Sequence, residues 1–238
     1  MLAFIRITLM TAALVIICIF SCLYCLLRPF HRNNVYLTAK VLGKVTKIFG
    51  LDVEVRVPDS VKNISPAVYI CNHQNSYDIF TAANAVLPNT VSVGKKSLKW
   101  IPFFGQMYWL TGNILIDRKN TNKAMNTIAL TAKKIRDKNI SVWLFPEGTR
   151  SNGKGILPFK TGAFRTAMQA DVPIIPICVS NMHQKVNLNR WDNGKIIIEY
   201  MEPIFLKDIT KDNVRAIANT TRENMKAKFE RLNIEAEQ

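Results

Sequence analysis

The chain begins with a long apolar segment and then alternates between short apolar runs and polar stretches. The segment 7–27 (ITLMTAALVIICIFSCLYCLL) has no charged residue, and a helix needs about 20 apolar residues to cross a bilayer. A cleaved signal peptide would have a shorter apolar region ending in a small-x-small site, which is absent here. A lipoprotein signal fits poorly, because Phe20 lies close before Cys22 where small residues belong. The segment is therefore predicted to be a retained membrane helix, which either crosses the bilayer or dips into one leaflet as a hairpin with residues 35–49.

The stretch 35–49 (VYLTAKVLGKVTKIF) separates its apolar residues and its lysines onto two faces at helical spacing. A basic amphipathic helix of this kind is typical of membrane interfaces. An ordinary surface helix that packs on a core has the same pattern. Its position directly after the apolar segment favours the interface. Residues 1–50 are thus expected to form an N-terminal membrane-associated segment.

After Gly50 the pattern changes to short apolar runs separated by helical stretches. Such alternation predicts an α/β domain, because each helix crosses over between neighbouring parallel strands. We expect one domain over 51–238, with a mostly parallel central sheet flanked by helices. The predicted strands are 52–57, 67–71, 90–94, 113–117, 141–145, 173–180 and 195–201. The predicted helices lie near 78–87, 97–111, 121–137, 160–170 and 209–234.

Charge refines this picture. The chain has 32 Lys and Arg against 17 Asp and Glu, a net charge of +15, although 48% of its residues are hydrophobic. A basic chain can bind nucleic acid or anionic lipid. The apolar N-terminus favours lipid as the partner, and no nucleic-acid partner is expected. Positive residues beside a membrane helix stay on the cytoplasmic side. Because most nearby cations follow the segment, the domain is expected in the cytoplasm. These cations are Arg28, Arg32, Lys40, Lys44 and Lys47.

The cysteines and histidines suggest no metal site. Three of the five cysteines lie in the apolar segment, and Cys71 and Cys178 fall in predicted buried strands, where a thiol acts as a small apolar group. His31 and His183 have no ligand spacing around them.

Polar residues that could perform chemistry follow the predicted strands, where ligands bind in α/β sheets. His73 follows the strand 67–71, and Asp78 lies five residues later. A histidine is suited to proton abstraction near neutral pH, and a carboxylate can fix its tautomer. On an unbroken helix the two side chains would point about 140° apart. They can therefore meet only if a turn precedes the helix, and the polar residues 72–76 favour such a turn. A surface histidine beside a helix-capping aspartate remains an alternative.

Cations follow the other strands. Arg118 and Arg150 each come after a strand, and the planar guanidinium suits phosphate. For either arginine alone, a surface ion pair is an equally good interpretation. Gly148 and Thr149 could add backbone N–H groups, although no P-loop pattern is present. No G-x-S-x-G nucleophile motif occurs, so a base without a protein nucleophile is favoured.

Together these motifs resemble those of the glycerolipid acyltransferase family. NHQNSYD resembles its first motif, GNILIDR its second, FPEGTRS its third and VPIIPI its fourth, all in the family's order. GKKSLKWIPFFGQ and LPFKTGAF resemble further family segments. The resemblance covers about residues 65–180 and is nearest to the bacterial 1-acyl-sn-glycerol-3-phosphate acyltransferases. Ser97 departs from the family pattern, in which many members have glutamate.

The resemblance implies a reaction and a location. His73 would deprotonate the sn-2 hydroxyl of lysophosphatidic acid, with Asp78 orienting it, and the oxygen would attack an acyl thioester on acyl carrier protein or coenzyme A. The product would be phosphatidic acid, and neither a metal nor another cofactor would be needed. The enzyme would lie at the bacterial inner membrane, facing the cytoplasm. The residues implied for the substrate phosphate and glycerol are Arg118, Glu147, Gly148, Thr149, Arg150, Lys95 and Lys96, and those for the acyl channel are Pro173 and Pro176.

Three alternatives remain at this point. The chain could acylate another lysophospholipid or glycerol 3-phosphate, although first-step enzymes are often longer. It could be a hydrolase that uses water in place of the lipid hydroxyl. It could also be a membrane-tethered protein that binds anionic lipid or nucleic acid, in which case His73 and Asp78 would be incidental.

Overall fold

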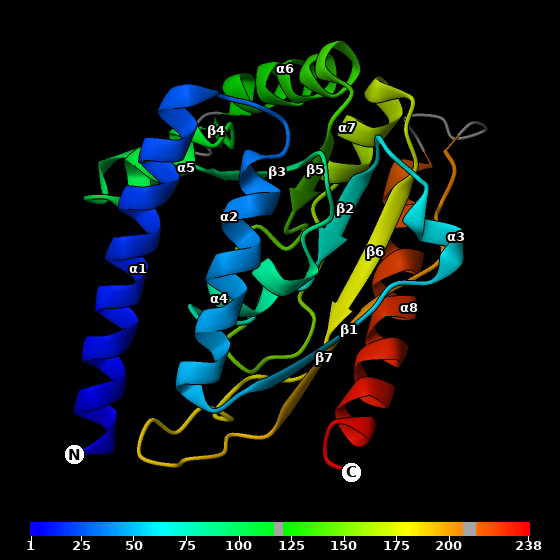
Figure 1. Ribbon diagram of the computed structural model, residues 1–238. Helices are drawn as coiled ribbons and strands as arrows, with labels where there is room; N and C mark the ends of the chain where they lie inside the picture. The colour runs from blue at the N-terminus through cyan, green and yellow to red at the C-terminus, as the bar shows by residue number, and fades with distance from the viewer. Residues whose placement is uncertain (117–120, 207–212) are drawn as a thin grey trace.

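A seven-stranded sheet forms the centre of the protein (Figure 1). The computed structural model describes residues 1–116, 121–206 and 213–238, with the backbone alone for 121–125. Arg118 therefore lies outside the described residues. The strand order is β1-β7-β6-β2-β5-β3-β4. The strands are β1 (Asp52–Arg56), β2 (Val68–Cys71), β3 (Thr90–Lys95), β4 (Ile114–Ile116), β5 (Ser141–Leu144), β6 (Ile174–Val179) and β7 (Lys195–Tyr200).

Most neighbouring strands of the sheet run parallel, as the alternating pattern predicts. The antiparallel pair is β6–β7, in which Ile177 lies opposite Tyr200. The central strands β2 and β6 are buried along their whole length, as expected for apolar runs covered on both faces. The carboxyl ends of β2, β5, β3 and β4 therefore lie along one edge of the sheet.

Helices cover both faces of the sheet and divide the core in two. α6, α7 and α8 pack on one face, where they enclose side chains such as Val68, Ile70 and Val142. α2, η1 and α4 pack on the other face around Tyr69, Cys71 and others. The helices are α1 (Leu2–Leu27), α2 (Asn34–Gly43), η1 (Lys44–Phe49), α3 (Asp59–Lys62), α4 (Asp78–Thr81), η2 (Ala82–Ala85), η3 (Lys96–Trp100), α5 (Phe104–Leu110), α6 (Thr121–Lys138), α7 (Gly162–Ala170) and α8 (Val214–Glu235).

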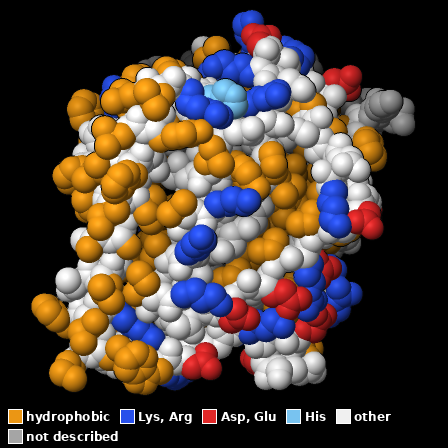
Figure 2. Space-filling view, viewed as in Figure 1, with side chains coloured by type: hydrophobic (Ala, Val, Ile, Leu, Met, Phe, Trp, Pro, Cys, Tyr) orange, Lys and Arg blue, Asp and Glu red, His pale blue; other side chains and the backbone are white. Residues whose placement is uncertain are grey.

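α1 is an apolar helix that lies on the outside of the domain. Among the described helices it alone is long and apolar enough to cross a membrane. One side packs on the core through Met10, Leu14 and Ile17. The other side is exposed, with Phe20 at 67% and Leu27 at 86%. Figure 2 shows hydrophobic side chains gathered along this side of the molecule. A helix so exposed is not the core helix of a water-soluble domain.

Both ends of α1 contact the rest of the protein. At its start, Arg6 is buried and its guanidinium donates hydrogen bonds to the carbonyl oxygens of Leu188, Arg190 and Trp191. Just beyond its end, Phe30 N–H donates to the carbonyl oxygen of Leu110. Figure 1 shows α1 alongside α2, with the N-terminus near the β6–β7 loop. In this conformation α1 lies against the domain near both of its ends.

Candidate active site

His73 and Asp78 meet where β2 ends. Residues 73–77 form a turn after the buried strand, and Asp78 begins α4. The turn folds the carboxylate back, so that His73 Nδ1 and Asp78 Oδ2 lie 2.5 Å apart. The His73 side chain is 20% exposed, whereas that of Asp78 is 7% exposed. The imidazole is thus held from the protein side and accessible from outside.

The Asp78 carboxylate also organises the turn itself. Its Oδ2 accepts the backbone N–H groups of Gln74 at 2.7 Å and Asn75 at 3.1 Å. Hydrogen bonds from N–H groups stabilise the charged form of a carboxylate. A fixed negative charge at Nδ1 holds the tautomer whose Nε2 can take up a proton, and it stabilises the resulting imidazolium. This arrangement suits His73 to act as a general base.

The two neighbours of His73 in sequence fix the loop to β6. Asn72 donates to the carbonyl oxygen of Val179 and accepts the Val179 N–H. Gln74 donates to the carbonyl oxygens of Val179 and Ser180, and its own oxygen accepts the Met182 N–H. Both amides are buried, so their hydrogen bonds are costly to lose. The histidine is therefore held rigidly on either side.

Glu147, which follows β5, braces the same loop. Its Oε1 accepts the backbone N–H of His73 at 2.7 Å, and its Oε2 accepts that of Leu157 at 3.0 Å. Burial raises the pKa of this carboxyl, and the two N–H groups partly counteract the rise. The resemblance implied that Glu147 contacts substrate. In the structure its two oxygens contact protein backbone, so the residue positions His73.

Phe145 packs on the imidazole, and Cys71 ends the strand that precedes it. The Phe145 ring stacks on that of His73, with centroids 4.1 Å apart and planes 17° apart. Cys71 is fully buried, and burial raises the pKa of its thiol well above the ordinary value, with a further increase from Asp78. A thiol with so high a pKa is a poor nucleophile, in keeping with a base that acts without a protein nucleophile.

The loop after β5 places an exposed cation beside His73. Ser151 N–H donates to the carbonyl oxygen of His73 at 2.8 Å, so the backbone of the adjacent Arg150 lies close to that of His73, and Thr149 precedes it. Both are exposed. Gly148 has a φ of +71°, and a Cβ added there would meet Lys160 Nζ at 2.9 Å. The sequence pattern gave Lys160 no role, although it lies in the LPFKTGAF segment, and it adds a second cation to this loop.

The other expected site residues lie farther from His73. Lys95 ends β3, two strands across from β2 in the sheet order, which is about 10 Å. Lys96 lines a cavity beside β4. Pro173 lies at the amino end of β6, opposite the carboxyl ends, and Pro176 is buried within that strand beside Ile70. Most of the apolar VPIIPI run forms the buried strand β6, and its assignment to the acyl channel stays a prediction.

Comparison with known proteins identifies the family of this chain. The acyltransferase family model matches residues 52–180. The 1-acyl-sn-glycerol-3-phosphate acyltransferase of Haemophilus influenzae is 50% identical over 99% of this chain and 98% of its own length. Its Escherichia coli counterpart is 50% identical over 93% of this chain and 90% of its own. The crystal structure of the 1-acyl-sn-glycerophosphate (LPA) acyltransferase PlsC from Thermotoga maritima covers 95% of each chain, with a TM-score of 0.74 and 20% identity, and shows the same fold. The chain belongs to the acyltransferase family.

Proposed function

We propose that this protein transfers an acyl group from an acyl thioester to the sn-2 hydroxyl of 1-acyl-sn-glycerol 3-phosphate and forms phosphatidic acid. The observation that carries the proposal is the His73–Asp78 pair, held at 2.5 Å at the carboxyl end of a buried strand. The similarity to bacterial 1-acyl-sn-glycerol-3-phosphate acyltransferases over nearly the whole chain supports this substrate.

The proposed reaction proceeds by direct transfer. His73 Nε2 takes the proton of the sn-2 hydroxyl as the oxygen attacks the thioester carbonyl carbon. Asp78 stabilises the imidazolium that forms. When the tetrahedral intermediate collapses, the carbon–sulfur bond breaks, and the departing sulfur takes the proton back from His73. The base returns to its starting state, and no cofactor is required beyond the thioester.

Arg150 is the residue we assign first to the substrate phosphate, because it is exposed in the loop hydrogen-bonded to His73. Lys160 lies against Gly148 in the same loop and adds positive charge. Arg118, Thr149 and Lys95 follow as further candidates. An arginine can hold a phosphate with two parallel hydrogen bonds. A cation beside the base would place the sn-2 hydroxyl near Nε2.

We place the enzyme at the bacterial cytoplasmic membrane, with its catalytic domain on the cytoplasmic face. The exposed side of α1 provides the apolar contact, and Arg6 keeps the start of that helix against the domain. We therefore propose that α1 lies in one leaflet. An N-terminal epitope tag tests this arrangement, because in sealed inside-out vesicles external protease should remove it together with the catalytic domain. A protected tag would establish a crossing helix.

The test of activity is an assay in mixed micelles with lysophosphatidic acid and a labelled acyl thioester. The acyl donor is supplied in parallel as a thioester of coenzyme A and as a thioester of acyl carrier protein. The faster reaction identifies the preferred carrier. His73→Ala should abolish transfer, whereas His31→Ala, a histidine beyond α1 and away from the carboxyl ends of the strands, should not. If His73→Ala retained normal turnover, the mechanism would be wrong. Labelled fatty acid as the main product would identify a hydrolase.

Arg150→Ala tests the phosphate assignment separately. It should raise KM for lysophosphatidic acid and leave the weak use of phosphate-free monoacylglycerol unchanged. Lys154→Ala, in the same loop, is the control. If the unaltered enzyme used monoacylglycerol as well as lysophosphatidic acid, the assignment of Arg150 to the substrate phosphate would be wrong.

A further inference from the structure

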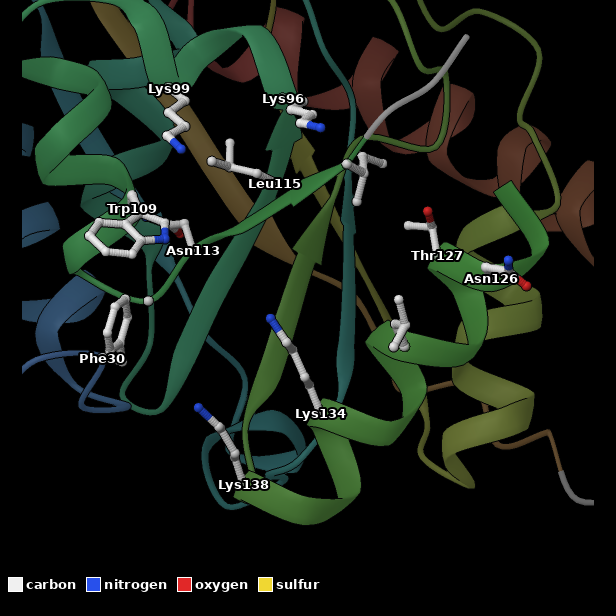
Figure 3. Close-up of a pocket in the computed structure, with 13 residues that line it drawn as sticks. Phe30, Lys96, Lys99, Trp109, Asn113, Leu115, Asn126, Thr127, Lys134 and Lys138 are labelled. Carbon is white, nitrogen blue, oxygen red and sulfur yellow. The ribbon is translucent and has the colours of Figure 1, made fainter. Parts of the chain in front are cut away.

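A cavity lies away from His73, at the edge strand β4. It has a volume of about 510 Å³ and opens between α6 on one side and Phe30 and Trp109 on the other (Figure 3). His73 follows β2, which is separated from β4 by β5 and β3. We call this cavity the β4 groove. Its lining includes Phe30, Trp109, Leu115, Leu130, Lys134 and Lys138.

The β4 groove is strongly basic. Lys96, Lys99, Lys134 and Lys138 line it, and no Asp or Glu is found among the described lining residues. In Figure 3, Lys134 and Lys138 both extend from α6 across the open space. A smaller adjoining cavity of about 340 Å³ shares these two lysines and adds His31 and Arg32. A concave surface lined with one sign of charge attracts a ligand of the opposite sign.

Lys134 and Lys138, the two lysines that α6 contributes to the groove, lack a counter-ion within the described part of the chain. Lys133, on the same helix, pairs with Asp137 at 2.6 Å, whereas Lys134 and Lys138 form no ion pair with any described acidic residue. Burial lowers the pKa of Lys134, and the charge of Lys138 lowers it further. Two unpaired cations in a concave site suit an anionic ligand.

The walls of the groove are apolar and continue into the exposed surface of α1. Phe30 lies three residues beyond the end of α1, and its ring packs edge-on against Trp109 at 5.0 Å. α5, which carries Trp109, packs along α1. Nearby, Lys99 Nζ lies 5.6 Å from the ring centre of Trp100, which is 77% exposed. Tryptophan and lysine side by side are typical of the level of lipid headgroups.

We propose that the β4 groove binds the phosphate-bearing headgroup of an anionic phospholipid, with Lys134 and Lys138 at the phosphate and the acyl chains beside Phe30 and Trp109. The proposal rests on the membrane association of α1 proposed above. A lipid is favoured over a soluble anion because the groove is partly apolar and adjoins the apolar face of α1. Basic side chains at an anionic membrane strengthen binding by about fivefold each.

The test is flotation of the full-length protein with phosphatidylcholine vesicles, with and without phosphatidylglycerol. Lys134→Gln/Lys138→Gln should weaken binding to the phosphatidylglycerol vesicles by about 25-fold and leave binding to pure phosphatidylcholine unchanged. The control Lys133→Gln/Lys226→Gln removes the same charge from ion-paired positions and should change binding less than twofold. Phosphatidylcholine binding also reports that each variant is folded.

Further arms distinguish the sources of phosphate. Tighter binding to phosphatidic acid than to phosphatidylglycerol at equal charge would assign the groove to a phosphate monoester lipid, and equal binding would assign it to lipid phosphates in general. An equal loss in both double variants would overturn the proposal in favour of diffuse charge. Millimolar inorganic phosphate could instead lower vesicle binding of the unaltered protein to the level seen for Lys134→Gln/Lys138→Gln. That result would overturn the proposal in favour of a soluble anion.

The proposed catalytic function is tested independently in detergent micelles, where the groove variant should keep its activity. If Lys134→Gln/Lys138→Gln lost the preference for phosphatidylglycerol vesicles but kept normal activity in micelles, the result would support lipid binding in the β4 groove. An inactive wild-type protein that retains lipid preference would contradict the catalytic proposal alone.

Discussion

The backbone N–H of His73 donates a hydrogen bond of 2.7 Å to the carboxylate of Glu147. Glu147 lies in the loop after β5, whereas His73 follows β2. The second oxygen of Glu147 accepts the N–H of Leu157. One buried carboxylate thus joins the base to two segments that are remote from it in sequence. The position of the imidazole depends on this bridge, although Glu147 does not contact the ring through a hydrogen bond that the structure describes.

Glu147→Gln should lower both stability and turnover. An amide has one acceptor oxygen, so its NH₂ group would face either the His73 or the Leu157 N–H and leave that donor without a partner. An unsatisfied buried donor costs about 1–3 kcal/mol. We expect a lower midpoint in thermal unfolding, and a fall in kcat that exceeds the change in KM. Unchanged stability with a raised KM for lysophosphatidic acid would instead show that Glu147 contacts the substrate.

Asp78→Asn should abolish most activity while keeping the turn. The amide oxygen can still accept the N–H groups of Gln74 and Asn75, which Asp78 accepts in the structure. It cannot supply the negative charge that stabilises the imidazolium, and a comparable loss in serine proteases lowers turnover by about 10⁴. Single-turnover transfer measures the effect. Asp137→Asn, an exposed aspartate, is the control, and similar rates for the two variants would contradict the role of Asp78.

The strands and the His73 turn could be predicted because their signals are local. Each strand is a short apolar run, and the structure confirms a strand at all seven predicted places. The turn followed from the five-residue spacing, since an unbroken helix would separate His73 from Asp78. Both inferences need only a few neighbouring residues.

The braces of the site could not be predicted, because they join residues far apart in sequence. Asn72 and Gln74 looked like ordinary turn residues, but they bind the end of β6 more than 100 positions later. Glu147 looked like part of a phosphate loop. The antiparallel direction of β7 is also absent from the pattern, because a buried apolar strand has the same composition in either direction. Arg6 illustrates the same limit, since a cation at the edge of an apolar segment resembles a membrane flank.

Arg6→Leu should detach the start of α1 from the domain. The guanidinium bonds three carbonyl oxygens of the β6–β7 loop, and a hydrogen bond to a charged group contributes about 1.5–3 kcal/mol. We expect a lower unfolding midpoint in detergent and faster proteolysis between residues 181 and 194. Arg215→Leu, at an exposed position on α8, is the control. Equal behaviour of the two variants would mean that α1 is not docked in solution.

Glu54 should make the stability of the β1 edge depend on pH in the acid range. Hydrogen bonds from Arg56, at 2.6 Å, and from Lys195 lower the pKa of its carboxyl to about 2. A lowered pKa in the folded state means that the ionised form is stabilised, so the contribution is complete above pH 4.5 and is lost as the pH falls toward 2. The Glu54 side chain is 35% exposed, so solvent screening limits the contribution to about 1 kcal/mol or less. The unfolding midpoint of Glu54→Gln should therefore lie below that of the unaltered protein at pH 7, and the difference should close between pH 4.5 and 2. The control is Glu202→Gln, at an exposed position just after β7, which should show no such convergence. If the difference between Glu54→Gln and the unaltered protein widened on acidification, the ion pair would be contradicted.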